Sequence, residues 1–374
     1  MHLADITIFW TNSCGGVRTY LEAKQRWLAE RQDIRHSLLV PGSDEGVKFN
    51  IFTLPAPRLP FGKGYRFPVR RRAWTEKLVM LGPDLIEAED PYVLPWAALE
   101  AGQRLGVPVV GFYHSDLQRL VTARAGHWSN RWLDRYLLRL YSRFDRVLAP
   151  SRVMADKLRH LGIPADRVHV QPLGVDSSLF HPDRRDQALR RRLGIEHHVR
   201  LLVFAGRGSR EKHIPLLLRV MTELGPDFHL HLVGSNMPRR LPANVSRSNG
   251  FVDPLRLSRI LASSDALLHG GDAETFGLVV LEAMASGIPV VGVNAGAVAE
   301  LVVPGTGLLA EPNSAASLAD TVKKLFADDY TAMGRRARQH VTANYTWAQV
   351  FSRLLDHYRE LTGRGPDSGE ADHG

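Results

Sequence analysis

Short apolar runs alternate along the chain with longer segments in which apolar residues recur every three or four positions. The short runs are rich in Val, Ile, Leu and Phe and predict buried strands, whereas the longer segments predict amphipathic helices. The expected strands are 6–10, 37–40, 51–54, 85–87, 109–113, 146–149, 168–171, 200–205, 229–233, 266–269 and 290–292. The expected helices are 17–31, 66–80, 95–105, 129–142, 152–160, 214–224, 254–263, 278–286 and 314–327. This alternation is typical of parallel α/β sheets with crossover helices.

A chain of 374 residues is longer than a single core usually becomes, so two domains are expected. The segment 177–198 has no strand pattern and is dense in charge, which predicts a linker. Doubly wound, Rossmann-like domains are therefore expected over 1–176 and 199–344. A further helix, about 345–362, is expected to pack back on the first domain, and 363–374 is expected to be a flexible tail.

Composition indicates a globular protein, with 44% hydrophobic and 23% charged residues. The single cysteine, Cys14, excludes an intrachain disulfide, and the N-terminus lacks the basic segment of an export signal. No apolar run reaches the roughly 18–20 residues that span a bilayer. We therefore expect a cytoplasmic protein. The net charge is +9, with +7 in residues 1–176 and +2 in the remainder, so the first half favours an anionic partner.

The segment 269–291 carries the clearest chemical pattern. It predicts a strand end, a glycine-bearing loop and a helix that begins near Gly277 and ends near Gly287. The free amides at that helix start suit a diphosphate, and carboxylates at Glu274 and Glu282 suit the vicinal hydroxyls of a sugar or a ribose. For this segment alone, a solvated Glu274 and a Glu282 on a helix surface would be an equally good interpretation.

Two cations follow the strand expected at 200–205. Arg207 and Lys212 would lie at the carboxyl edge of the sheet, where open α/β folds bind ligands. Together they can neutralise a departing nucleoside diphosphate, although each alone would be an ordinary surface charge. The acids Asp272 and Glu274 beside these cations would make a poor divalent site, so we expect no catalytic metal.

These motifs together resemble the retaining nucleotide-sugar glycosyltransferases of family 4, which have the GT-B fold. The most specific element is the pair of glutamates spaced by seven residues, Glu274 and Glu282. The supporting elements are Gly15-Gly16-Val17, His114, Ala149-Pro150-Ser151, Pro172-Leu-Gly-Val-Asp176, Phe180, Arg207 and Lys212. The resemblance covers roughly residues 13–360. It implies two Rossmann-like domains that face each other across a cleft, the first binding an acceptor and the second a nucleotide sugar.

The resemblance also implies roles for single residues. Glu274 matches the carboxylate that holds hydroxyls of the donor sugar, and Glu282 matches the ribose ligand. Arg207 and Lys212 match the clamp on the pyrophosphate. His114 matches the histidine beside the donor sugar and is counted with Glu274 as catalytic. The positions whose backbone would approach the donor are Gly16, Phe276, Gly277 and Leu278.

Three positions depart from the family pattern. Gly208 follows Arg207 where an apolar residue is usual, and His213 follows Lys212 where a glycine is usual. The segment 294–297 holds Asn-Ala-Gly-Ala where paired glycines are commoner. The loop geometry at these places is left open by the sequence.

The motifs are most similar to those of GDP-mannose-dependent α-mannosyltransferases and lipid glycosyltransferases. The expected reaction is transfer of a hexose, mannose from GDP-mannose, to a membrane lipid or lipid-linked glycan, with the nucleotide sugar as a substrate and no cofactor. A UDP-sugar donor with a soluble acceptor is the alternative, because no side chain in the sequence distinguishes guanine from uracil.

Basic and aromatic residues are interleaved in 58–77 and in 117–146. The first segment contains Arg70, Arg71, Arg72 and Trp74, which we expect to form an acceptor or membrane surface. Solvated helix faces over core aromatics would give the same pattern. Nucleic acid is not expected, because no recognition motif accompanies the charge. The prediction is peripheral binding at the cytoplasmic face of an anionic membrane. A function of a different class is a non-catalytic, polyanion-binding protein on the same fold.

Overall fold

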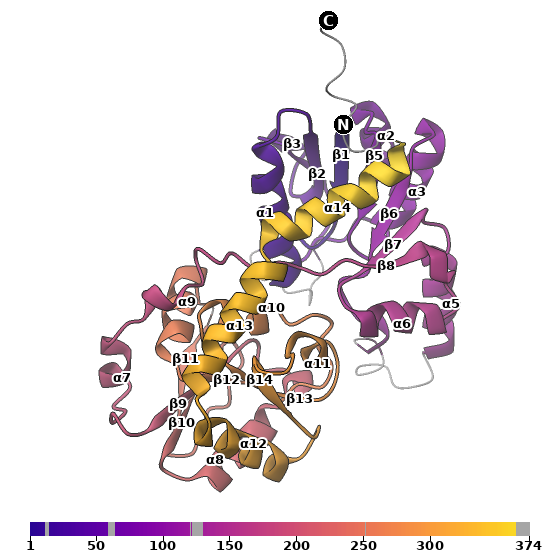
Figure 1. The fold of residues 1–374 in the computed structure, drawn as a ribbon. Helices are drawn as coiled ribbons and strands as arrows, with labels where there is room; N and C mark the ends of the chain where they lie inside the picture. The colour runs from indigo at the N-terminus through magenta and orange to yellow at the C-terminus, as the bar shows by residue number, and fades with distance from the viewer. Residues whose placement is uncertain (12–14, 59–63, 120, 122–129, 251, 364–374) are drawn as a thin grey trace, which may run out of the picture. The chain divides into compact units, whose positions relative to one another are not determined.

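The computed structural model describes residues 1–11, 15–58, 64–119, 121, 130–250 and 252–363, and Figure 1 shows its elements. The chain divides into two compact units. Unit 1 comprises Met1–Pro172 together with Trp347–Gly374, and unit 2 comprises Leu173–Thr346. The first boundary thus follows Pro172, a few residues before the boundary expected from the sequence. Both units are α/β, as the alternation of strands and helices predicts.

Unit 1 is built on a sheet whose strand order, over the described residues, is β3-β4-β2-β1-β5-β6-β7-β8. The strands are β1 (His2–Ile6), β2 (Arg35–Gly42), β3 (Gly46–Lys48), β4 (Ile51–Pro55), β5 (Leu85–Ala88), β6 (Val109–Phe112), β7 (Arg146–Ala149) and β8 (Val168–Val170). Neighbouring strands are parallel except for the β3–β4 pair. The chain reverses its winding direction at β1, so ligands are expected beyond the carboxyl ends of β1 and its neighbours.

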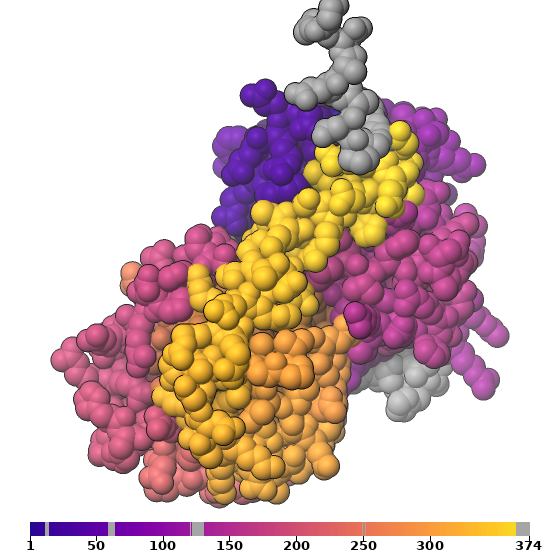
Figure 2. Space-filling view, in the orientation of Figure 1, coloured from indigo at the N-terminus to yellow at the C-terminus, as the bar shows by residue number. Residues whose placement is uncertain are grey.

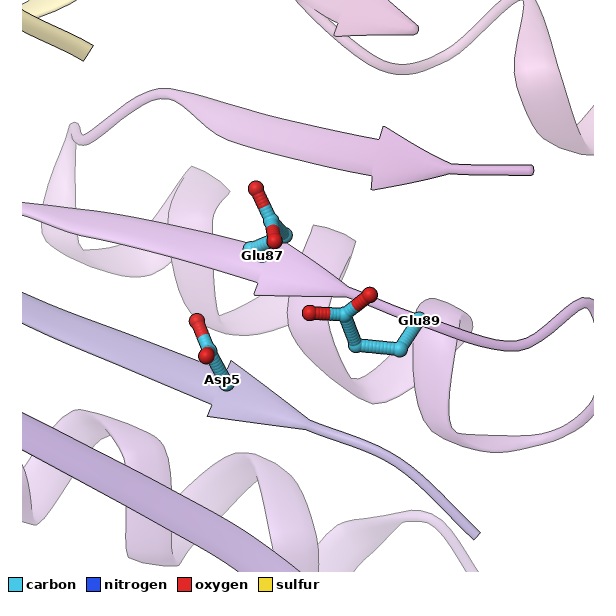
Figure 3. A group of neighbouring side chains, drawn as sticks. All are labelled: Asp5, Glu87 and Glu89. Atoms are coloured by element: carbon cyan, nitrogen blue, oxygen red, sulfur yellow. The ribbon is translucent and has the colours of Figure 1, made fainter. Parts of the chain in front are cut away.

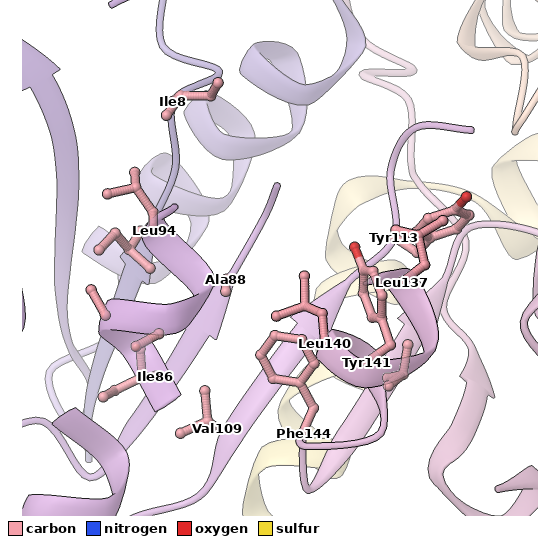
Figure 4. Packing of buried hydrophobic residues seen from close by; sticks show 14 of the residues in the cluster. Ile8, Ile86, Ala88, Leu94, Val109, Tyr113, Leu137, Leu140, Tyr141 and Phe144 are labelled. Atoms are coloured by element: carbon pink, nitrogen blue, oxygen red, sulfur yellow. The ribbon is translucent and has the colours of Figure 1, made fainter. Parts of the chain in front are cut away.

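Helices cover this sheet and close its core. They include α1 (Gly16–Ala29), α2 (Arg72–Leu81), α3 (Leu94–Leu105), α5 (Asn130–Tyr141) and α6 (Arg152–His160), with the short η2 (Ala165–Arg167) before β8. Ile86 and Val109 from the sheet pack with Leu94, Leu137 and Phe144 from the helices and their connections, as Figure 4 shows. This apolar packing fixes the strand ends that carry the polar residues of unit 1.

Unit 2 has a second sheet, in which the described strands follow the order β11-β10-β9-β12-β13-β14, with all neighbours parallel. The strands are β9 (Arg200–Ala205), β10 (Phe228–Gly234), β11 (Val245–Asn249), β12 (Ala266–Leu268), β13 (Val290–Val293) and β14 (Gly307–Ala310). The helices are α7 (Ala188–Arg192), α8 (Ile214–Leu224), α9 (Pro254–Ser263), α10 (Leu278–Ala285), α11 (Val298–Leu301), α12 (Ala315–Ala327) and α13 (Tyr330–Asn344), with the short turns η3 (Pro182–Arg184) and η4 (Arg210–Lys212). Here the winding reverses at β9, which lies between β10 and β12.

The segment 177–198 is packed onto unit 2 and is not a free linker. The amide of Asp186 donates a hydrogen bond to Ser263 Oγ at 2.7 Å, and Arg190 forms an ion pair with Asp265. The turn η3 and the helix α7 both contact α9. Charge density and the missing strand pattern predicted the linker, but two of these charges, Arg190 and Arg192, have acidic partners within the fold.

Helix α14 (Trp347–Thr362) returns to unit 1 and packs against α1. Figure 2 shows it in yellow along the surface of that unit. Residues 364–374, which include nearly all of the expected tail, lie outside the described residues. No helix in the described part of the chain combines the length and the apolar character needed to cross a membrane.

Several elements differ from the sequence expectation. The first strand is His2–Ile6 and not 6–10, because Asp5 is buried within the strand beside Lys24. Helix α2 begins at Arg72 and not at residue 66. The strands β3, β11 and β14 and the helix α13 were not expected from the pattern.

Candidate active site

The carboxyl ends of β9 and β10 approach each other closely in unit 2. The amide of Gly208 donates to the carbonyl of Ser235 at 2.8 Å. A Cβ atom at Gly208 would lie 2.3 Å from the carbonyl oxygen of Asn236, and one at Gly234 would lie 1.9 Å from that of Gly206. The unusual glycine after Arg207 is therefore required by backbone packing. The side chain of Arg207, which follows β9, is exposed. Its guanidinium group has no hydrogen-bond acceptor among the described residues.

Lys212 on η4 forms an ion pair with Glu274, which lies on the loop that follows β12. The same Glu274 oxygen, Oε1, lies 3.1 Å from Nε2 of His269. Burial, together with the charges of Lys212 and His213, lowers the pKa of His269 to about 3. The ring is therefore neutral, and its Nε2–H donates to Glu274. Both contacts occupy Oε1, so Oε2 of Glu274 remains without a hydrogen-bond partner among the described residues.

His213 completes this loop in an unusual backbone conformation. Its φ and ψ are 50° and 39°, the left-handed region that a glycine adopts more easily. Its Nε2 lies 3.2 Å from Oδ1 of Asp272, so the side chain links η4 to the β12 loop. The histidine thus retains the backbone turn of the usual glycine and adds a contact of its own.

The start of α10 supplies unpaired backbone amides. Gly277 is the N-cap residue with φ 96° and ψ 57°, and no side chain caps the helix. Its neighbour Phe276 is buried with its ring 6.4 Å from that of Tyr345, so only the backbone of Phe276 is available to a ligand. Gly296 backs the loop, because a Cβ there would lie 3.1 Å from the carbonyl oxygens of Asp272 and Glu274. An anion at this helix start would meet free N–H groups.

Glu282 lies one turn further into α10 and is half-buried. Burial raises its pKa to about 7. Its carboxylate has no hydrogen-bond or ion-pair partner among the described residues, which is costly for a buried acid. A ligand with hydroxyl groups would supply the missing donors. Arg207, Lys212, Glu274, Gly277 and Glu282 are thus all contributed by unit 2, from the segments that follow β9 and β12 and from α10.

The remaining predicted site residues, Gly16 and His114, belong to unit 1. Gly16 begins α1, and Gly15, its N-cap, offers no side-chain cap. His114 follows β6, and its ring stacks on Phe112 with centroids 3.8 Å apart. Nε2 of His114 contacts the carboxyl group of Glu89. Burial and the charge of Lys24 lower the pKa of His114 to about 3, so the imidazole is neutral.

Glu89 is a buried partner of His114 that sequence reasoning missed. Burial and the neighbouring Glu87 raise its pKa well above the usual value for a glutamate. Nδ1 of His114 and Oε1 of Glu89 have no hydrogen-bond partner in the described structure. The only sequence signal was the run Glu87-Ala-Glu-Asp90 at a strand end, which places acids at the edge where a ligand is expected.

Three buried carboxylates, those of Asp5, Glu87 and Glu89, converge from β1 and β5, as Figure 3 shows. One oxygen from each lies within 4.8 Å of the others, a spacing that a metal ion would accept. Nζ of Lys24, however, donates to Asp5 and to Glu87 at 2.9 Å each and to the hydroxyl of Tyr358 at 2.8 Å. The ammonium therefore supplies the positive charge at this cluster.

In the basic segment at the start of α2, the structure contradicts one predicted surface residue. Arg70, Arg71 and Arg72 are exposed, and Nε of Arg71 lies 3.0 Å from Glu100 Oε2. Trp74, which we expected on the same surface, is 2% exposed and belongs to the core of unit 1. On a helix, residue 74 shares a face with Leu78, and that face packs inward. The prediction of Trp74 as a surface residue is therefore wrong.

Comparison with known proteins supports a common family. Residues 14–179 match the family model described as Glycosyltransferase Family 4, and residues 185–340 match the one described as Glycosyl transferases group 1. A GDP-mannose-dependent alpha-mannosyltransferase of Mycolicibacterium smegmatis is 34% identical over 287 residues, which cover 75% of each chain. A GDP-mannose-dependent alpha-(1-6)-phosphatidylinositol dimannoside mannosyltransferase of Mycobacterium tuberculosis is 28% identical and covers 95% of each.

Solved structures share the fold. Sucrose-phosphate synthase from Thermosynechococcus elongatus superposes with a TM-score of 0.77 at 21% identity, covering 97% of this chain and all of that one. The Anabaena protein HepE, in complex with UDP and glucose, gives a TM-score of 0.74 at 19% identity, covering 96% and 100%. These neighbours are GT-B glycosyltransferases. The chain is therefore an enzyme and not a non-catalytic polyanion-binding protein: it is a hexosyltransferase that belongs to glycosyltransferase family 4 and has the GT-B fold.

Proposed function

We propose that the enzyme transfers mannose from GDP-mannose to a membrane lipid or lipid-linked glycan, with retention of configuration and without a metal ion. The observation that carries the donor assignment is the likeness, at 34% identity over 75% of the chain, to relatives named as GDP-mannose-dependent alpha-mannosyltransferases. The lipid acceptor is favoured by the relative that is named for a phosphatidylinositol dimannoside and spans 95% of the chain.

The residues of unit 2 fit the donor. Arg207 and the amides at the start of α10 would bind the diphosphate, and Lys212 would add a second positive charge. The free Oε2 of Glu274 would accept hydrogen bonds from hydroxyls of the mannose, and the unpaired carboxylate of Glu282 would accept them from the ribose. The cations would thus provide the charge neutralisation for which other transferases use a metal.

The proposed reaction is a front-face displacement. The bond between C1 of mannose and the phosphate oxygen breaks, and a bond forms between C1 and the acceptor hydroxyl oxygen on the same face. The hydroxyl proton passes to the departing diphosphate, which leaves as GDP. Arg207 and Lys212 stabilise the charge that develops on that leaving group. His114 is neutral, so its imidazole would position a sugar hydroxyl and not act as a cation.

The test combines donor choice, acceptor choice and stereochemistry. The purified enzyme is incubated with GDP-α-mannose or UDP-glucose and with vesicles that contain phosphatidylinositol, and products are identified by mass. We expect a mannosylated lipid with an α linkage by NMR, and its loss in Glu282→Gln but not in the exposed control Glu223→Gln. Turnover of UDP-glucose alone would overturn the donor assignment, and a β-linked product would overturn retention.

A further inference from the structure

A hollow of about 660 Å³ lies in unit 2 between α7, α9, the edge strand β11 and its neighbour β10. Its volume is within the range of small-molecule sites. None of its lining residues belongs to the donor motifs at the ends of β9 and β12 or to α10. The residues that carry its charge are Arg192, Arg247, Arg256, Arg259 and Asp186.

The positive charges of this hollow are incompletely neutralised. Asp186 is the only acid in the lining, and it is already paired with Arg192. Arg247 donates through Nη1 to the carbonyls of Met237 and Pro238, which carry no net charge. Among the described residues, neither Arg256 nor Arg259 forms an ion pair, although the charge of Arg259 helps to lower the pKa of Asp186. One turn of α9 separates the two arginines, and both line the same hollow.

The floor of the hollow is polar and fixed. His231 is 2% exposed, and its ring nitrogens lie 2.8 Å from Ser246 Oγ and 3.0 Å from Ser248 Oγ. Burial, with the charges of His229 and Arg256, lowers the pKa of His231 to about 4, so this ring adds polarity without charge. A guanidinium group binds a phosphate with two parallel hydrogen bonds, which makes converging arginines a phosphate site.

We propose that this hollow binds a phosphomonoester of sugar-phosphate size, at a second site distinct from the donor site. Such a ligand would place its phosphate between Arg256 and Arg259 and its hydroxyls toward the serines of β11. It would also join α7 to α9, because Arg192 on α7 lines the same space. The inference does not depend on the identity of the donor or acceptor.

The test uses glucose 6-phosphate as the probe and the full-length enzyme. Calorimetric titration is compared among the wild type, the double variant Arg256→Gln/Arg259→Gln, and the control Arg219→Gln, an exposed arginine on α8. The variant Arg207→Gln removes phosphate binding at the donor site. We expect the dissociation constant to rise about tenfold or more in the double variant and to stay unchanged in the two single variants.

Hydrogen exchange locates the bound probe. We expect slower exchange in α7 and in α9, and no change at 206–213. Binding that disappears only in Arg207→Gln, or protection confined to 206–213, would place the probe at the donor site and overturn the proposal. No binding of the free probe, together with weaker binding of phosphatidylglycerol vesicles in the double variant, would make the hollow a lipid contact and would also overturn it.

Discussion

The ammonium group of Lys212 donates a hydrogen bond to the carboxylate of Glu274, so these two residues of the proposed donor site neutralise each other. Lys212 lies on η4 after β9, and Glu274 lies on the loop after the neighbouring strand β12. A bound diphosphate would compete with Glu274 for the lysine. The pair therefore keeps each group oriented and limits the cost of holding an isolated charge near the core.

Replacing the lysine should weaken nucleotide binding. Lys212→Met removes a charge-assisted hydrogen bond worth about 1.5–3 kcal/mol, so the dissociation constant of GDP should rise by about 10- to 150-fold. Calorimetry measures this, with Lys323→Met on α12 as an exposed control. Equal affinities for GDP in the two variants would contradict the assignment of Lys212 to the donor site.

Glu282 should make the free enzyme less stable as pH rises. Its pKa is about 7 in the folded state and 4.5 in the unfolded state, so the folded state binds more protons between these values and stability falls over that window. At about 1.4 kcal/mol per pKa unit, the difference between these two pKa values limits the loss to at most about 3.5 kcal/mol by pH 8, and the partial exposure of Glu282 to solvent makes it smaller. Glu282→Gln should therefore raise Tm at pH 8 but not at pH 4, in thermal unfolding without ligand. A lower Tm in the variant at pH 8 would contradict the conclusion that the Glu282 carboxylate has no partner in the folded enzyme.

The backbone at His213 gives a comparison of two variants. His213→Ala keeps the left-handed backbone and loses the contact with Asp272, so it should destabilise the enzyme by about 1 kcal/mol or more. His213→Gly loses the same contact but relieves the backbone strain, so it should be more stable than the alanine variant. Denaturant unfolding measures both. A glycine variant less stable than the alanine variant would argue against strain at this position.

The buried charges of unit 1 should be strongly coupled. Burial acts to raise the pKa of Asp5, but the charges of Lys24 and His36 lower it below its usual value. Lys24→Met removes the ammonium group shared by Asp5 and Glu87 and should cost about 3–5 kcal/mol of unfolding free energy at pH 7. Asp5 keeps its contact with His36, and Glu87 keeps the hydroxyl donors of Tyr20 and Tyr358. The deficit should shrink as pH falls below 5, because the two acids take up protons once the ammonium is gone. Equal deficits at pH 4 and pH 8 would show that lost packing, and not charge, causes the effect.

The arginines before α2 test the membrane proposal. Changing Arg70, Arg71 and Arg72 to Gln removes up to about 3 kcal/mol of attraction to an anionic surface, at about 1 kcal/mol per charge. Flotation with phosphatidylglycerol vesicles should show weaker binding with less dependence on salt. Donor hydrolysis should continue, since these residues lie in unit 1, outside the donor motifs. If the triple variant binds vesicles as strongly as the wild type, the segment that contains Arg70, Arg71 and Arg72 is a solvated surface and not a membrane contact.

Local patterns were sufficient to predict most of the helices and strands. The helix bounds 214–224 and 254–263 agree with α8 and α9, because apolar periodicity and Gly or Pro boundaries are local signals. The spacing of Glu274, Glu282, Arg207 and Lys212, together with the resemblance to family 4, singled these residues out, and the structure places all four in unit 2. Strand β1 was misplaced because its Asp5 is compensated by Lys24, nineteen residues away, and no local pattern reveals that partner.

Other features depend on contacts that the sequence pattern does not contain. The contact of His114 with Glu89 joins residues 25 positions apart, and that of Lys24 with Tyr358 joins residues 334 positions apart. His269 was visible only as the first residue of a motif, and its bond to Glu274 depends on how the loop after β12 folds back. Trp74 was misassigned because an aromatic residue among arginines suits both a membrane surface and the inner face of a helix.

The hydrogen bond from Lys24 to Tyr358 also bears on the order in which the two units can be completed during synthesis. Unit 2 is a continuous segment that is complete once Thr346 has been made, whereas unit 1 lacks α14 until the ribosome has passed Tyr358. Until then, one partner of the buried ammonium is missing and the face of α1 that α14 covers is open to water. Unit 1, whose first strand is synthesised first, is therefore completed last. A nascent chain arrested before α14 would have all of unit 2 but only part of unit 1.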